Sequence, residues 1–355
     1  MDLQELLALT VKNNASDLHL MPGIPPVLRI DGELTYLSSY SILSPEAVQS
    51  MLFSLLTPEQ KNLLISGKEL DFSIPYGKGI YGDIGRFRVN AYFQRNQLCA
   101  ALRFLQRGIR TIEELHIPTI CHSFTKLRQG LVLITGPTGH GKSTTLAAII
   151  NEINMTRAAH ILTVEDPIEY VYPVGKSMIS QRELKTDTLS WAAALKSALR
   201  EDPDVVLVGE MRDPDTMSAA MTIAETGHLV FSTLHTNSAA QSVDRIIDSF
   251  PTSQQSQVRT QLAFVLQGII SQRLLPMLSG GRIPAVEVMI GTPAVASNIR
   301  DGKTHLIDSI IQTSQDVGME TLDSSLAQLI LSGIISLDIA KNYSLHPNEL
   351  LQLVG

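Results

Sequence analysis

The chain has 355 residues, of which 44% are hydrophobic and 18% are charged, and its formal net charge is −7. This length is typical of a globular protein of two domains rather than of a single core. The acidic balance, without any run of lysines and arginines, argues against a nucleic-acid-binding surface. The two cysteines, Cys99 and Cys121, have no metal-ligand spacing and provide no disulfide framework, which favours a reducing compartment.

The apolar runs of the chain are short. The longest, such as VVLVG, have the length of a strand, and none approaches the roughly 20 residues of a membrane span. The first residues include Asp2 and Glu5 and no basic segment, so we do not expect them to form a signal peptide. We therefore expect a cytoplasmic protein without direct membrane insertion.

The first third of the chain combines short helical and strand patterns. Residues 1–17 have apolar residues at helical spacing, and Ser16–Leu20 alternates polar and apolar residues as a strand does. The next elements are, in chain order, a hairpin bending at Asp31-Gly32, helices beginning after Ser44 and at Thr57, and the strands ELDFSIPY, RFRVNAYFQ and LCAALRFL. These elements predict a mixed α+β domain over residues 1–106, followed by a linker over residues 107–117.

From residue 118 the pattern changes to strands that alternate with helices. The predicted elements are, in order, the strand GLVLITG, the helix STTLAAIINEIN, the strand HILTVED, the helix TLSWAAALKSALR capped by Thr186 or Asp187, the strand DVVLVGE, the helix DTMSAAMTIAETG and the strand HLVFSTLHT. Apolar strands alternating with helices indicate an α/β fold with a parallel sheet covered on both faces. After Phe250 we expect helices, apart from one strand over residues 282–289, with a helical C-terminal region over about 292–355.

The segment GPTGHGKST, residues 136–144, fits the P-loop pattern G-x-x-x-x-G-K-[ST]. It follows a predicted strand and opens a predicted helix, which is the context that the pattern requires. Its glycines let backbone N–H groups turn towards phosphate oxygens, and the helix N-terminus adds a favourable dipole. The lysine can reach the β- and γ-phosphates of ATP, and the serine can ligate Mg²⁺. The residues expected to bind ATP are Gly136, Pro137, Thr138, Gly139, His140, Gly141, Lys142, Ser143 and Thr144.

Acidic residues follow two other predicted strands. Glu165 and Asp166 end one of them, and Glu210 ends another. Because ligands bind beyond the carboxyl ends of parallel strands, we expect these acids beside the P-loop. One carboxylate could hold Mg²⁺ through water while the other orients the attacking water, and the sequence leaves open which does which. The structural alternative is a helix N-cap, chiefly for Asp166 or Asp213.

Two histidines flank the predicted strand Leu229–Leu234. His235 follows its carboxyl end, where it could contact the γ-phosphate or sense its loss, and His228 lies at its entrance. For each histidine taken alone, a structural hydrogen bond is the alternative interpretation.

Three arginines, Arg86, Arg88 and Arg103, lie on predicted strands of the first domain, and the first two share one strand face. A cation supplied to the developing charge accelerates phosphoryl transfer, so these arginines are candidates for that role. The alternative, which the residues alone favour, is a solvated strand face.

Together these segments resemble the secretion-superfamily ATPases, specifically the PilT family of type IV pilus retraction motors, over nearly the whole chain. SDLHL with PPVLRIDGEL resembles the family's opening, and RFRVNAYFQ and ALRFL resemble its arginine-bearing segment. GPTGHGKSTTLAAIIN resembles its Walker A motif, and ILTVEDPIEY its Asp box. LREDPDVVLVGEMRD resembles its Walker B motif, and AETGHLVFSTLHTNSAAQSVDRIIDSFP its His box.

The resemblance implies a homo-hexameric ring in which a PAS-like domain precedes a RecA-like ATPase domain, residues 118–355. It implies hydrolysis of ATP, with Mg²⁺, that drives pilus retraction and twitching motility at the cytoplasmic face of the inner membrane. The implied partners are an inner-membrane pilus platform protein and other pilus ATPases. By this resemblance, Lys142 and Ser143 bind phosphate and Mg²⁺, Glu165 is the catalytic carboxylate, and Glu210 supports Mg²⁺ or water. His228 and His235 couple the nucleotide state to the domain position. The arginine finger is among Arg86, Arg88 and Arg103, and Arg245 is a further interface cation.

Two departures from the family's pattern bear on function. His140 stands where a small residue, usually serine, is common, and Thr292–Ile307 keeps only the Asn-Ile-Arg core of the retraction-linked signature. The alternatives are a pilus assembly or type II secretion ATPase, an accessory paralogue, and a regulatory subunit with degenerate catalysis. Assembly ATPases usually carry a longer N-terminal extension and often a four-cysteine zinc insertion, which two cysteines cannot form.

Overall fold

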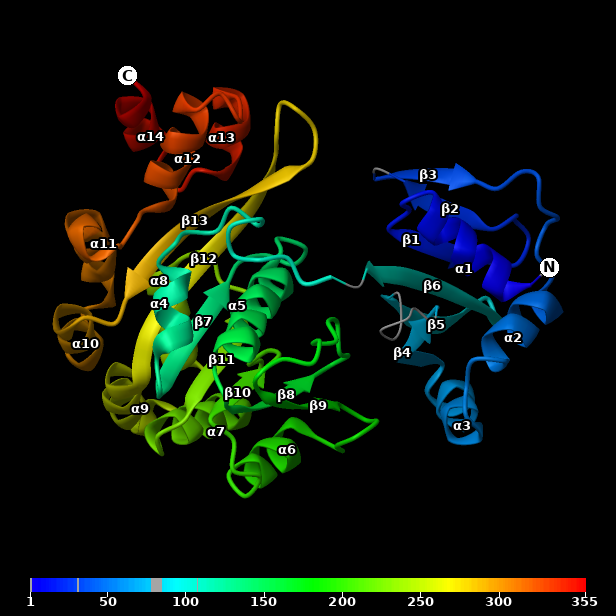
Figure 1. Cartoon of the computed structure of the whole chain (residues 1–355), viewed down its shortest axis with the longest axis horizontal. Helices are drawn as coiled ribbons and strands as arrows, with labels where there is room; N and C mark the ends of the chain where they lie inside the picture. The colour runs from blue at the N-terminus through cyan, green and yellow to red at the C-terminus, as the bar shows by residue number, and fades with distance from the viewer. Residues whose placement is uncertain (1, 31, 78–84, 107) are drawn as a thin grey trace. The chain divides into compact units, whose positions relative to one another are not determined.

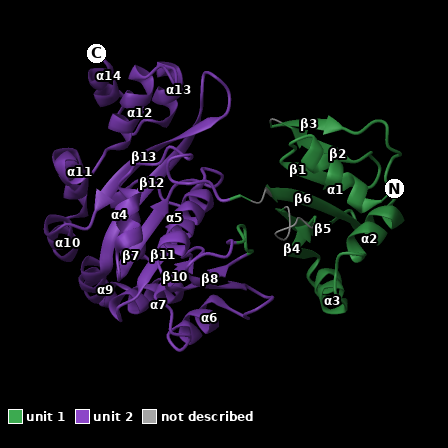
Figure 2. Ribbon diagram, viewed as in Figure 1, with its two compact units in different colours: residues 1–108, 167–171 green, residues 109–166, 172–355 purple. Residues whose placement is uncertain are grey.

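The computed structural model describes residues 2–30, 32–77, 85–106 and 108–355. The chain divides into two compact units, which Figure 2 distinguishes by colour. Unit 1 comprises residues 1–108 and 167–171, and unit 2 comprises residues 109–166 and 172–355. Within the described residues, no helix is both long and apolar enough to span a bilayer.

Unit 1 is built on a six-stranded antiparallel sheet in the order β3-β2-β1-β6-β5-β4 (Figure 1). Its elements are α1 (Leu3–Lys12), β1 (Asp17–Leu20), β2 (Val27–Ile30), β3 (Glu33–Tyr36), α2 (Pro45–Phe53), α3 (Pro58–Gly67), β4 (Glu69–Tyr76), β5 (Gly85–Gln94) and β6 (Gln97–Gln106). Apolar residues of the three helices and of one sheet face form a single core. The predicted elements of this α+β domain are therefore present, although Asp31, at the tip of the predicted hairpin, lies outside the described residues.

Local side-chain chemistry fixes the helix starts in unit 1. Ser44 precedes α2, and its hydroxyl accepts a hydrogen bond from the Ala47 N–H. Thr57 and Gln60 form a reciprocal capping box at the start of α3. In both helices a proline occupies the first turn, where its missing N–H costs nothing.

Unit 2 contains a seven-stranded sheet in the order β13-β12-β7-β11-β10-β8-β9. Its strands are β7 (Gly130–Thr135), β8 (His160–Glu165), β9 (Met178–Glu183), β10 (Val205–Val208), β11 (Leu229–Leu234), β12 (Leu266–Pro276) and β13 (Arg282–Ile290). Neighbouring strands are parallel except for β12 and β13, which form an antiparallel hairpin. The predicted α/β fold is thus confirmed, with a mixed rather than an all-parallel sheet.

Helices cover both faces of this sheet (Figure 1). They are α4 (Cys121–Lys126), α5 (Lys142–Thr156), α6 (Trp191–Ala198), α7 (Pro214–Glu225), α8 (Ala239–Asp248), α9 (Thr252–Val265), α10 (Pro293–Arg300), α11 (Ile307–Thr313), α12 (Leu322–Leu331), α13 (Leu337–Tyr343) and α14 (Pro347–Val354), with 3-10 turns at Thr304–Leu306 and Gln315–Val317. One face packs on α4 and α5, and the other packs on helices from α6 to α11. Helices α12 to α14 pack against the end of the β12–β13 hairpin near its turn, at Leu275, Ile283 and Ala285.

Two sequence predictions in unit 2 are wrong, and one strand was not predicted. Residues 266–276 were expected to be helical, but they form β12, an inner strand with apolar residues on both faces, and such a run does not distinguish a strand from a buried helix. Strand β9 was not predicted, because it is a half-buried edge strand without an apolar run. Helix α6 is capped by Ser190, whose hydroxyl accepts from the Ala193 N–H. Neither Thr186 nor Asp187 caps it, since both lie in the turn after β9, where Asp187 accepts from the Glu183 N–H.

Candidate functional site

The P-loop connects the end of β7 to the start of α5. Its three glycines have positive φ angles of 140° at Gly136, 81° at Gly139 and 82° at Gly141. A Cβ atom at Gly136 would also lie 2.3 Å from the carbonyl oxygen of Gln272, so only glycine fits there. No side chain caps the N-terminus of α5, which leaves its first N–H groups for an anion.

Lys142 lies under this loop and is buried, with 8% of its surface exposed. Its Nζ donates to the carbonyl oxygens of Gly136 at 2.8 Å and Pro137 at 3.0 Å. These bonds hold the ammonium group beneath the loop, where it adds positive charge to the helix N-terminus. The neighbouring Ser143 is exposed, so its hydroxyl is accessible to a ligand. The donors and the charge of this site fit the phosphates of ATP.

The parallel register brings three strand ends to the P-loop edge of the sheet. Thr135 pairs with Leu234, and Val208 pairs with both Ser232 and Val164. The residues that follow these strand ends, among them Glu210 and His235, therefore share the edge with Glu165, as predicted.

Glu165 is buried, with 9% of its surface exposed. Its Oε1 accepts hydrogen bonds from Thr163 Oγ1 at 2.7 Å and from Gln181 Nε2 at 3.3 Å. These donors orient the carboxylate at the end of β8, and Gln181 reaches it from β9, the strand that the sequence pattern did not reveal.

His235 lies at the centre of the polar contacts at this edge. Its Nε2 is 3.3 Å from Glu210 Oε2, and its Nδ1 is 3.4 Å from both Lys142 Nζ and Thr138 Oγ1. The opposite oxygen of Glu210 accepts from Arg212 Nε at 2.6 Å. Arg212 was not among the predicted site residues, although it follows Glu210 by two positions. One imidazole thus contacts both the P-loop and the acid that follows β10.

His228 lies at the other end of β11 from this cluster. The six residues of the strand separate it from His235, which corresponds to about 20 Å of extended chain. Its Nδ1 lies 3.0 Å from the Ile223 carbonyl oxygen and 3.1 Å from Thr226 Oγ1. Within this chain it makes structural hydrogen bonds and does not join the P-loop site. Arg245 is exposed in the last turn of α8.

Asp166 and Asp213 are the two acids for which the sequence also allows a role as a helix N-cap. Asp213 is the N-cap of α7, where its Oδ1 accepts from the Thr216 N–H at 2.8 Å, so the structural alternative is correct for it. Asp166, at the end of β8, is exposed.

The three strand arginines share one face of the unit 1 sheet. Arg88 lies directly opposite Arg103 in the register of β5 and β6, and Arg86 is two residues away on β5. Each has a polar partner within unit 1. Arg86 Nη2 donates to Ser73 Oγ at 2.5 Å, Arg88 Nη2 lies 2.6 Å from Asp71 Oδ2, and Arg103 Nε lies 2.9 Å from Asp17 Oδ1.

A second group of polar side chains from the β12–β13 hairpin surrounds the site, and none of them was predicted. Gln272 contacts the P-loop, whereas Arg273 Nη2 donates to Oδ1 of Asn237, in the loop after His235, at 2.9 Å. On β13, Glu287 Oε1 accepts from the Ala239 N–H at the start of α8, at 2.6 Å. Gln272 and Arg273 were missed because residues 266–276 do not look like a strand in sequence, whereas Glu287 lies on the strand predicted over residues 282–289, which carries no motif.

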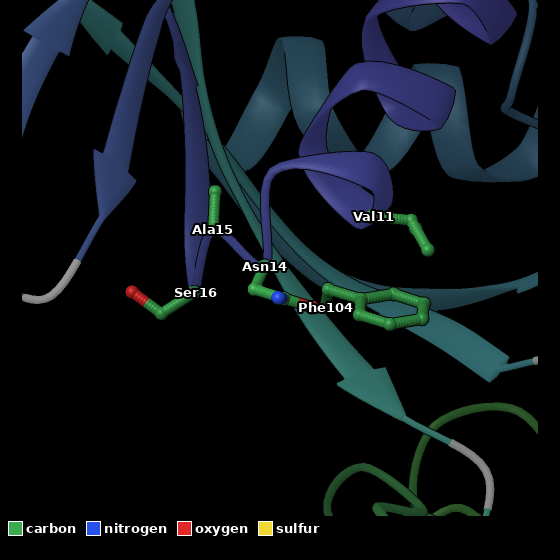
Figure 3. Close-up of a pocket in the computed structure, with 5 residues that line it drawn as sticks. All are labelled: Val11, Asn14, Ala15, Ser16 and Phe104. Atoms are coloured by element: carbon green, nitrogen blue, oxygen red, sulfur yellow. The ribbon is translucent and has the colours of Figure 1, made fainter. Parts of the chain in front are cut away.

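A cavity in unit 1 is lined by none of the predicted site residues (Figure 3). It is lined by Val11, Asn14, Ala15, Ser16 and Phe104.

The residues at the P-loop edge also fit Mg²⁺ accompanying ATP. Across the described ranges, no cluster of three or more histidine, cysteine, aspartate and glutamate side chains could hold a metal ion. Mg²⁺ at nucleotide sites instead uses few protein ligands together with phosphate oxygens and water. The Ser143 hydroxyl and the Glu210 carboxylate offer such ligands.

Comparison with known proteins agrees with this geometry. Residues 79–319 match the family model described as type II/IV secretion system protein. The chain is 44% identical over 349 residues to the type IV pilus retraction ATPase PilT of Pseudomonas aeruginosa, covering 98% of this chain and 100% of that protein. It is 38% identical over 355 residues to the type IV pilus ATPase PilU of the same organism, covering 100% and 91% of the two chains.

Among solved structures, the crystal structure of the pilus retraction motor PilT with bound ADP matches with a TM-score of 0.91 and 44% identity. The match covers 99% of both chains. The chain therefore belongs to the type II/IV secretion system protein family and, within it, to the PilT pilus-retraction ATPases.

Proposed function

We propose that this chain is the subunit of a homo-hexameric motor that couples Mg²⁺-dependent ATP hydrolysis to type IV pilus retraction. The observation that carries the proposal is a P-loop with its buried lysine, within a chain that matches a retraction ATPase over 98% of its length. In this proposal unit 2 is the RecA-like ATPase domain, and residues 1–106 form the PAS-like domain.

The proposed chemistry assigns a role to each residue of the P-loop edge. Lys142 and the loop N–H groups bind the phosphates, and Ser143 and Glu210 support Mg²⁺, which neutralises charge on the phosphate oxygens. Glu165, held by Thr163 and Gln181, orients the water that attacks the γ-phosphate. His235, within reach of both Glu210 and Lys142, responds to the presence or loss of the γ-phosphate.

The strand arginines are proposed to act in the assembled ring. Arg86, Arg88 and Arg103 share one sheet face. Their partners, which are Ser73, Asp71 and Asp17 respectively, keep them oriented. One of them would stabilise the charge that develops during phosphoryl transfer. The proposed site of action is the cytoplasmic face of the inner membrane, where a platform protein would receive the motion. Arg245 and His228 are proposed to lie at subunit contacts, since neither joins the P-loop site of its own chain.

The direction of pilus movement is tested by counting surface pili in cells that lack this protein. An excess of pili with loss of surface motility is expected for a retraction motor, and the wild-type gene but not Lys142→Ala should restore the normal number. Bald cells would instead indicate an assembly motor.

The similarity to PilU over the whole chain favours an accessory paralogue as the second candidate. An unchanged pilus number, together with ATPase activity of the purified protein, would support that role and contradict the main motor.

A further inference from the structure

Strand β12 continues past the end of β7 and runs beside the P-loop. The last pair of the β7–β12 ladder is Thr135 with Ser271, whereas β12 extends to Pro276 with β13 as its partner. The hydroxyl groups of Thr135 and Ser271 lie 2.8 Å apart at this point. The residues of β12 from Gln272 onwards therefore flank the loop rather than the strand.

The Gln272 side chain contacts the P-loop and the first turn of the helix that follows it. It is buried, with 3% of its surface exposed, and its Nε2 donates to the carbonyl oxygen of His140 at 2.8 Å. Its Oε1 accepts from the Thr145 hydroxyl, in the first turn of α5, at 2.7 Å. One amide thus satisfies both of its polar ends on the P-loop and on the helix that follows it.

The side chain of His140 adds a second connection to β12. Its Nδ1 accepts a hydrogen bond from the Leu274 N–H at 3.0 Å, which requires the proton of the neutral ring to be on Nε2. Burial, with the charges of Arg273, Lys142 and Arg282, lowers the pKa of His140 and favours this neutral form.

The packing between β12 and the loop leaves little freedom. A Cβ at Gly136 would meet the Gln272 carbonyl oxygen at 2.3 Å, and one at Gly141 would meet Gln272 Nε2 at 2.9 Å. These close approaches and the three hydrogen bonds all join Gln272 or Leu274 to residues 136–145. They hold the backbone in the conformation that points its N–H groups at a phosphate.

We propose that Gln272 is a positioning residue for ATP binding, and that the imidazole of His140 assists it by tying the P-loop to β12. The pair prepares the loop before nucleotide arrives, so that binding energy is not used to order it. The proposal rests on ATP turnover at this P-loop and is independent of the direction of pilus movement.

The test compares nucleotide binding and turnover in variants of the full-length protein. Gln272→Leu keeps the size of the side chain and removes both hydrogen bonds. We expect it to raise the Kd for a fluorescent ADP analogue and the KM for ATP about tenfold or more, with a much smaller change in kcat. Asn154→Leu is the matched control, because it removes the hydrogen bond of a buried amide to the Pro173 carbonyl oxygen at the other end of α5 from the P-loop.

A Gln272→Leu protein that loses stability as Asn154→Leu does, but keeps wild-type nucleotide affinity, would overturn the proposal. If Gln272→Leu does not fold, His140→Ala and His140→Asn decide the question. The Asn Oδ1 can replace Nδ1 as the acceptor, so His140→Asn should retain affinity and His140→Ala should lose it. Equal affinities in these two variants would contradict the positioning role.

Discussion

Glu287 carries a buried carboxyl group whose ionisation opposes folding. It lies on β13 with 5% of its surface exposed, and its Oε1 accepts from the Ala239 N–H at the start of α8. Burial, opposed in part by the charge of Arg273, raises the pKa of Glu287 from its ordinary value of 4.5 to about 7. The folded protein therefore holds this proton more tightly than the unfolded chain does.

The sign of the pH dependence follows from this difference. Because the pKa of the folded state is the higher one, the free energy of unfolding falls as the pH rises from about 4.5 to about 7 and is constant above that range. A pKa difference of one corresponds to about 1.36 kcal/mol, so the difference between 4.5 and about 7 limits the cost of ionising Glu287 to about 3.4 kcal/mol. Glu287→Gln removes the ionisation and keeps an oxygen acceptor for the Ala239 N–H. The variant should gain stability relative to wild type between pH 5 and pH 8, by up to about 2.5 kcal/mol.

Tryptophan fluorescence makes this measurement specific to unit 2. The chain has one tryptophan, Trp191, which packs against the core of that unit. Denaturant titrations at pH 5 and pH 8 would give the free energy of unfolding for wild type and variant at each pH. Comparing the two pH values cancels any constant cost of burying the amide in Glu287→Gln. Glu349→Gln changes an exposed glutamate on a helix in the same way and is the control for the loss of a surface charge. Identical responses of wild type and Glu287→Gln to pH would refute the reasoning.

Three further predictions concern the site and the fold around it. Lys142→Ala should weaken nucleotide binding and abolish phosphate release, because it removes the buried ammonium beneath the P-loop; near-normal rates would exclude the site assignment. Glu210→Gln should retain ATP while lowering turnover on the order of 10²-fold, as seen by comparing nucleotide retention with phosphate release. His122 bridges Glu113 at 3.0 Å and Glu152 at 2.8 Å, and the Glu152 carboxylate raises the pKa of His122. The stabilisation that protonated His122 provides is present below its ordinary pKa and is lost as the pH rises through the raised pKa. His122→Ala should therefore lower the free energy of unfolding of unit 2 by roughly 0.5–1 kcal/mol more at pH 6 than at pH 9. A loss that does not depend on pH would contradict this sign.

The sequence by itself determined the phosphate site along one edge of the sheet. The P-loop is a local pattern, in which glycines, a lysine and a hydroxyl act within a few residues of one another. Glu165, Glu210 and His235 could be grouped with it because parallel strands end at one edge, and the structure brings them to that edge. The same reasoning places His228 away from this edge, because it lies at the opposite end of β11, the strand that precedes His235.

Only the tertiary structure decided what supports those residues. The Gln272 side chain meets the Thr145 hydroxyl across 127 residues of chain, and Arg103 meets Asp17 across 86. Strand β12 is an inner strand of a sheet that helices cover, and it carries buried apolar residues on both faces beside the buried Ser271, Gln272 and Arg273. Its sequence therefore lacks the alternation that marks a half-buried strand. Motif chemistry is short-range and can be predicted from residue order. The burial of Glu287 and the contacts of Gln272 depend on which distant segments pack together, and residue order alone does not specify this.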